Sequence, residues 1–135
     1  MTAKQWLSRA RWINREIREL SVKEQEARDR LTKITQSYES DGAQMTKDPH
    51  KFDRLVEYQS MIEENLAEQA TVKSEIMAAI YQLKDRRQRL ILMGRYLDMK
   101  KWEQIAYELN YSYMNVTRIH GYALQEVQKI IGKDK

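Results

Sequence analysis

Apolar or small side chains recur at alternating spacings of three and four residues through the first third of the chain, and no other feature constrains the fold as strongly. These positions are Trp6, Ala10, Ile13, Ile17, Leu20, Ala27, Leu31, Ile34 and Tyr38, with Glu24 at the one missing step. A seam sustained over roughly four heptads is typical of a helix that packs lengthwise against another helix. Thr2 and Gln5 have the spacing of a capping box, so this helix is predicted to begin there.

A second seam follows a predicted helix stop at Gly42. Asp48 and Pro49 supply an N-cap and a first-turn proline for a new helix. Its apolar positions are Leu55, Tyr58, Ile62, Leu66, Val72, Ile76, Ile80 and Leu83, interrupted by Asn65 and Gln69. The low counts of glycine (4) and proline (1) also favour helices. We therefore predict an all-α chain in which residues 1–84 form a long antiparallel helical hairpin, a coiled coil for oligomerisation or partner contact.

The two seams predict a register for this hairpin. Placing Leu31 opposite Ile62 sets Glu24 opposite Gln69, so both seams become polar at the same level. A polar layer of this kind specifies the register of a coiled coil at some cost in stability.

The second seam is wider than one partner helix needs, because Leu66 and Ile80 broaden it. A homodimer through the hairpin is therefore expected. The longest apolar runs, residues 76–81 and 90–93, are far too short to cross a bilayer, and no targeting segment is recognised. We expect a cytoplasmic protein with no membrane partner.

The net charge of +4 comes entirely from the C-terminal part of the chain. Residues 1–84 carry 14 Lys and Arg against 14 Asp and Glu, whereas residues 85–135 carry 10 against 6. Lys and Arg near phosphates release condensed counterions, so a polyanionic partner is expected for residues 85–135.

Features of an enzyme are missing from the sequence. Cysteine is absent, the two histidines, His50 and His120, lack metal-ligand spacing, and there is no glycine-rich phosphate loop. We therefore predict no catalytic, cofactor-binding or metal-binding residues, and the chain is not expected to be an enzyme.

The pattern after residue 84 predicts three shorter helices. Asp85 and Gln88 have capping-box spacing at the start of the first, the second covers residues 102–109, and the third runs from an N-cap at Ser112 toward Ile131.

The second and third of these helices fit a helix-turn-helix. Apolar residues occur where its two helices must face each other, at Ile105, Leu109, Val116 and Ile119. Ala106 fits their close crossing, and Asn110 suits a left-handed turn. Residues 85–135 are therefore predicted to form a helix-turn-helix domain that binds double-stranded DNA.

Residues 90–96, 102–109 and 112–124 together resemble region four of bacterial sigma factors. The combination of Arg95-Tyr96, Trp102, Tyr111-Ser112 and residues 119–124 is more similar still to the ArpU-like late transcription regulators of Gram-positive phages. This resemblance implies sequence-specific promoter binding, with RNA polymerase as a further partner.

Carried onto this chain, the resemblance gives a recognition helix that exposes Tyr113, Met114, Asn115, Thr117 and Arg118 to the major groove. Arg118 is the candidate for a guanine contact and Asn115 for an adenine contact, because their forked groups match those base edges. Lys100, Lys101 and Lys129 are expected to touch phosphates. Sigma region four usually has charged residues where Tyr113 and Met114 stand, and Lys101 replaces a hydroxyl residue that commonly caps the first helix of the motif.

Three functions are compatible with these features. The first is a DNA-binding regulator of late phage or prophage genes. The second is a small terminase subunit that recognises DNA for packaging and assembles rings. The third is a sigma-mimicking protein that binds RNA polymerase without reading DNA.

Overall fold

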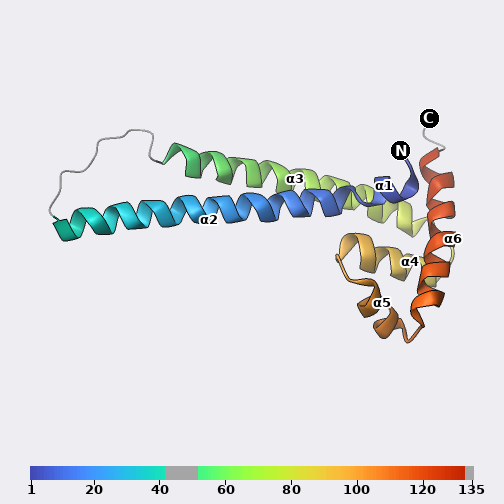
Figure 1. The fold of residues 1–135 in the computed structure, drawn as a ribbon. Helices are drawn as coiled ribbons and strands as arrows, with labels where there is room; N and C mark the ends of the chain where they lie inside the picture. The colour runs from blue at the N-terminus through green and yellow to red at the C-terminus, as the bar shows by residue number, and fades with distance from the viewer. Residues whose placement is uncertain (42–51, 133–135) are drawn as a thin grey trace. The chain divides into compact units, whose positions relative to one another are not determined.

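The computed structural model describes residues 1–41 and 52–132, with side chains described up to residue 33 in the first range. Its elements are α1 (Ala3–Leu7), α2 (Arg9–Asp41), α3 (Asp53–Tyr81), α4 (Arg86–Leu92), the π-helical turn η1 (Met93–Leu97), α5 (Trp102–Leu109) and α6 (Tyr113–Gly132) (Figure 1). The described part of the chain contains only helical elements, so the all-α prediction is confirmed. The predicted helix stop at Gly42 and the cap at Asp48 and Pro49 lie outside the described residues.

The chain divides into two compact units. Unit 1 consists of Met1–Trp12 and Gln69–Lys135, and unit 2 consists of Ile13–Glu68. The division falls within α2 and within α3, so each long helix contributes to both units.

Unit 1 begins with the predicted capping box. The Thr2 hydroxyl accepts from the Gln5 N–H at 3.2 Å, and the Gln5 side chain accepts from the Thr2 N–H at 2.9 Å. The prediction of one continuous first helix is wrong, however, because the helix is interrupted at Ser8. There Arg9 Nε donates to the Trp6 carbonyl at 2.9 Å, and the next turn restarts with Arg11 and Trp12 bonded to the Ser8 carbonyl.

Unit 1 buries apolar residues from both ends of the sequence. The Ala3 N–H donates to Gln128 Oε1 at 2.8 Å, which ties α1 to α6 across 125 residues. An ion pair of 2.9 Å joins Arg9 to Glu75 on α3. The buried side chains include Ala3, Leu7, Ala10, Val72, Ile76, Ile80, Leu83, Ala123 and Val127. Because Ile80 is completely buried within unit 1, it does not widen an outward seam as the sequence predicted.

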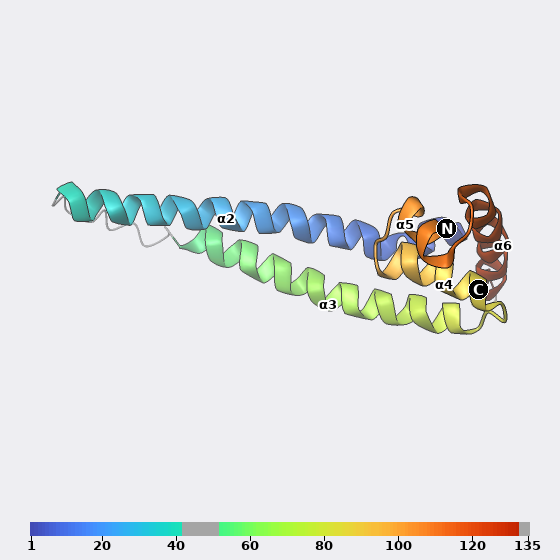
Figure 2. The same ribbon diagram turned by 90° about the horizontal axis from the view of Figure 1, so that it is seen from below.

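Unit 2 consists of segments of α2 and α3 that run side by side in opposite directions (Figures 1 and 2). The side chain of Gln59 donates to Glu24 Oε1 at 3.5 Å. The predicted register, which placed Gln69 opposite Glu24, is therefore wrong by ten residues. Apolar steps recur every three to four residues, so a shift of about one and a half heptads still sets apolar side chains opposite apolar side chains.

Candidate nucleic-acid interface

Helices α4, α5 and α6 pack together around a small apolar core. The buried residues of this core are Ile91, Ile105, Ala106, Val116 and Ile119, and Trp102, Leu109 and Tyr111 pack against it. Three of the four apolar residues predicted to face one another belong to the buried set, and Leu109 lies at its edge. Ala106 is buried in the cluster, as its small side chain predicted.

The turn between α5 and α6 is left-handed. Asn110 has φ 58° and ψ 42°, which confirms the predicted conformation. Its N–H bonds to the Tyr107 carbonyl at 3.1 Å, and the Tyr111 N–H bonds to the Ala106 carbonyl at 2.9 Å. Ser112 Oγ then accepts from the Asn115 N–H at 3.1 Å, which confirms Ser112 as the cap of α6.

The segment from η1 to α5 is stabilised by contacts that were not predicted from the sequence. A Cβ on Gly94 would lie 3.3 Å from Ile105 Cγ1, so glycine allows η1 to approach α5 closely. Arg95 Nη1 donates to the Lys100 carbonyl at 3.1 Å, while its guanidinium lies 4.6 Å from the centre of the Trp102 ring. Lys101 makes no side-chain cap bond to α5, as predicted from the missing hydroxyl.

A buried polar pair joins η1 to α6. The Tyr96 hydroxyl and His120 Nε2 are 2.7 Å apart, and the Trp102 ring meets the imidazole edge-on at 4.6 Å. Burial lowers the pKa of His120 to about 4 and raises the pKa of Tyr96 to about 12. Both groups are therefore neutral near pH 7, and the tautomer of the imidazole decides which of the two donates the hydrogen bond. The two residues are 24 positions apart, and no local pattern indicated that they meet.

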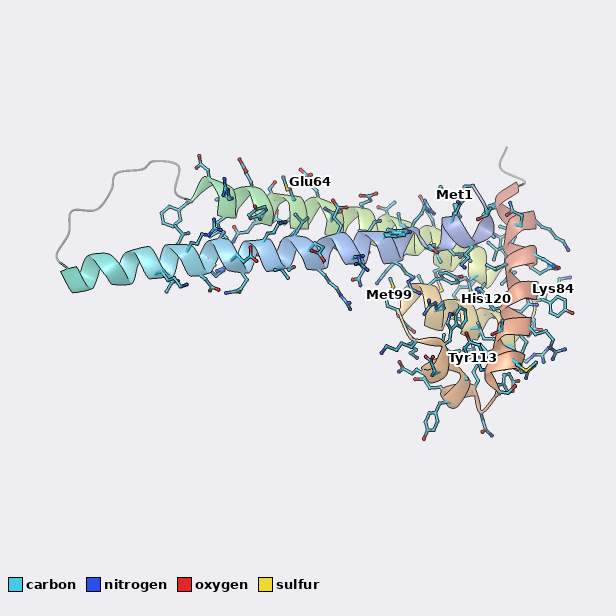
Figure 3. All side chains as sticks on the ribbon, viewed as in Figure 1. Met1, Glu64, Lys84, Met99, Tyr113 and His120 are labelled. Atoms are coloured by element: carbon cyan, nitrogen blue, oxygen red, sulfur yellow. The ribbon has the colours of Figure 1, made fainter. Side chains whose placement is uncertain are left out.

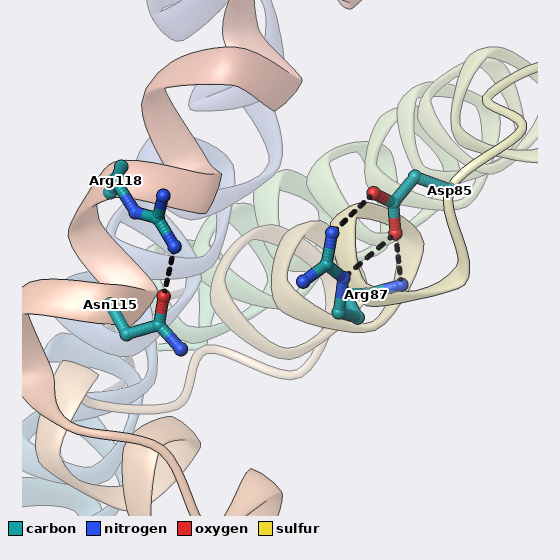
Figure 4. A network of polar contacts seen from close by, with 4 residues as sticks. All are labelled: Asp85, Arg87, Asn115 and Arg118. Carbon is teal, nitrogen blue, oxygen red and sulfur yellow. Dashed lines mark hydrogen bonds and ion pairs between the residues drawn. The ribbon is translucent and has the colours of Figure 1, made fainter.

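The start of α6 presents the predicted readout residues together. Met114 is 82% exposed and Tyr113 is 55% exposed, at the end of α6 that carries the Tyr113 label in Figure 3. Thr117 Oγ1 donates to the Tyr113 carbonyl at 2.9 Å. Arg118 Nη2 donates to Asn115 Oδ1 at 2.7 Å, a contact that the sequence did not predict (Figure 4).

The three predicted phosphate lysines have different surroundings. Lys100 pairs with Glu108 at 2.8 Å, and this hydrogen bond raises the pKa of Lys100 and lowers that of Glu108. Lys101 is exposed and forms no ion pair with a described residue. Lys129 pairs with Glu126 at 3.1 Å and lies eleven residues after Arg118, roughly 16 Å further along α6 at 1.5 Å per residue. The structure therefore does not bring Lys129 to the exposed start of α6.

A further cation, Arg87, lies on α4 and was not predicted from the sequence. Asp85 caps this helix, as predicted, but its carboxylate accepts from the Arg87 N–H at 2.8 Å and does not form the predicted capping box with Gln88. The Arg87 guanidinium returns to the same carboxylate at 3.1 Å and lowers the pKa of Asp85 (Figure 4). The Asp85 carboxylate in turn raises the pKa of Arg87. Tyr111, beside the turn that precedes α6, raises it by a smaller amount.

Among residues 1–33 and 52–132, whose side chains the structure describes, there is no cluster of three or more His, Asp or Glu side chains that is able to hold a metal ion. No helix within these ranges combines the length and the apolar character needed to cross a membrane.

Comparison with known proteins places the chain in a family. No curated protein and no solved structure matches the sequence. Residues 30–128, from α2 to α6, match the family described as "Protein of unknown function (DUF1492)". Because this match covers well over half of the sequence, the chain belongs to the DUF1492 family.

Proposed function

We propose that this chain is a sequence-specific double-stranded DNA-binding regulator of phage or prophage transcription. In this proposal α5, the Asn110 turn and α6 form a helix-turn-helix, and α6 is its recognition helix. The observation that carries the proposal is the exposed first part of α6, where Asn115 and Arg118 stand on a helix fixed from behind by a buried core.

The arrangement suits DNA for steric and electrostatic reasons. The major groove admits an α-helix, and the N-terminal part of a recognition helix reaches base edges. Ala106 and the left-handed Asn110 set the crossing of α5 and α6, so the start of α6 is packed against a buried core. The charge excess of residues 85–135 supplies attraction to phosphates.

The long helices have a separate role in this proposal. Antiparallel segments of α2 and α3 would form the hairpin through which two copies dimerise. A dimer gains affinity by placing two recognition helices on two half-sites. RNA polymerase remains a second proposed partner, as the resemblance to sigma region four implies.

Substitutions at two cations test DNA recognition. Arg118→Ala should cost about 1 to 3 kcal/mol of binding free energy on a selected site and much less on random DNA, because a lost base contact removes discrimination. Lys101→Ala should weaken both kinds of DNA alike and reduce the salt dependence by about one unit of slope. Lys129→Ala is the matched control, since it removes the same charge far from the start of α6.

Binding is measured on selected and random DNA over a salt series, without polymerase. A wild-type protein that enriches no sequence from a random pool would refute the proposal. Specific binding by the protein alone would exclude a sigma mimic that only binds polymerase as the main activity. Assembly into rings would instead favour a small terminase subunit.

A further inference from the structure

We propose that Asn115 is a positioning residue for Arg118, and that the two side chains together read a single guanine base pair. This inference rests on the proposed function, because it concerns how the same helix distinguishes one base pair from another. It replaces the sequence-based expectation that Asn115 reads an adenine on its own.

The contact between the two side chains fixes the orientation of the Asn115 amide. A guanidinium carries only donors, so the amide atom 2.7 Å from Arg118 Nη2 must be the carbonyl oxygen. In Figure 4 this oxygen faces Arg118, whereas the amide nitrogen points away from it. The N–H of Asn115 is bonded to Ser112 Oγ, so the residue is anchored in the first turn of α6.

This orientation changes what each side chain can read. A bidentate contact to adenine needs the carbonyl to accept from the N6 amino group while the amide NH2 donates to N7. In Asn115 a charge-assisted hydrogen bond from Arg118 already takes one of the two lone pairs of this carbonyl, so an adenine would have to share the acceptor with the guanidinium. Arg118 uses one of its five N–H donors in this bond, so enough remain for both O6 and N7 of guanine.

The neutrality of Asn115 also matters. A carboxylate in its place would orient the guanidinium equally well but would cancel its charge in front of a polyanion. Arg118 forms no ion pair with any residue in the described ranges, so its full charge is available to DNA. An amide therefore restricts the guanidinium while preserving the electrostatic attraction to phosphates.

The test compares base-pair preferences of four variants on the site that the wild-type protein selects from random DNA. Arg118→Ala should lose about 5- to 150-fold of the preference for one guanine. Asn115→Ala should lose about two- to fivefold at that same base pair and nothing elsewhere, because it removes only the orienting hydrogen bond. The double variant should match Arg118→Ala. Asn115→Asp keeps the acceptor, so it should retain the guanine preference while weakening binding to all DNA.

Two results would overturn this inference and leave the proposed function standing. One is a loss of preference for an adenine at another base pair in Asn115→Ala, with the guanine preference intact. The other is additive effects of the two alanine substitutions. Failure of the wild-type protein to select any sequence would remove both proposals together. Thermal unfolding of each variant verifies folding, and the bond from the Asn115 N–H to Ser112 does not depend on the substituted side chain.

Discussion

His120 illustrates how a single buried side chain links α6 to the rest of unit 1. Its imidazole is 8% exposed and bonded to Tyr96, and burial lowers its pKa to about 4 from the usual 6.5. Protonation of His120 therefore favours the unfolded chain. Its contribution to stability is complete above about pH 6.5 and is lost as the pH falls from 6.5 toward 4.

The size of this effect follows from the pKa shift. At 1.36 kcal/mol per pKa unit, the free energy of unfolding should fall by about 3 kcal/mol across this pH range. His120→Gln, which cannot become charged, should lack this part of the pH dependence. Urea unfolding of both proteins at several pH values gives the difference between their free energies of unfolding. Carboxylates that titrate in the same pH range contribute equally to both proteins, so their effect cancels in this difference. Parallel stability profiles would show that His120 does not titrate as its burial implies.

Residues whose role is local were predicted well from the sequence. The caps at Thr2, Asp85 and Ser112 and the left-handed Asn110 each depend on neighbours within a few positions. The Tyr96 to His120 contact was missed, because it joins distant residues through the folded core. The bond between Asn115 and Arg118 was missed for a different reason. Both residues were expected to point outward toward DNA, and helix spacing alone does not show where an amide turns.

At the scale of elements, helix boundaries were predictable and helix pairing was not. The bounds of α5 agree with prediction because a periodic apolar run marks the helix and Asn110 marks its end. The interruption at Ser8 escaped prediction, since the apolar seam continues across it and Arg9 bonds back to Trp6. The register of α2 and α3 was not predicted correctly, because a heptad pattern is compatible with several registers. Each of them places apolar positions of one helix opposite apolar positions of the other.

A pair of cysteine variants tests the observed register within unit 2. The chain has no native cysteine, so Glu24→Cys with Gln59→Cys gives two thiols whose parent side chains are in contact. A short bifunctional maleimide should join them within one chain. Leu31→Cys with Ile62→Cys is the matched control, since the observed register separates these positions by roughly 15 Å along the helices. Denaturing gels and mass spectrometry distinguish links within a chain from links between chains. Efficient joining of the control pair alone would restore the sequence-based register.

At the scale of the whole molecule, the distribution of burial differs between the two units. Unit 1 buries apolar side chains from α1, α3, α4 and α6. In unit 2, Ile13 is the one buried apolar side chain among the residues whose side chains are described. Two helices that bury so little apolar surface gain little to offset the entropy of ordering them. A second copy of the chain would supply the missing cover.

We therefore predict that the full chain is a dimer at micromolar concentration, held together through unit 2. Val56 and Leu66 on α3 are 58% and 49% exposed, so they are available to a second copy. Val56→Lys combined with Leu66→Lys should give a monomer, because burial of two ammonium groups opposes association. Tyr81→Lys combined with Tyr107→Lys adds the same charge at exposed positions of unit 1 and should leave the dimer intact. Sedimentation equilibrium of the three proteins decides between these outcomes. A wild-type monomer, or equal dissociation by both double substitutions, would show that unit 2 does not carry the dimer contact.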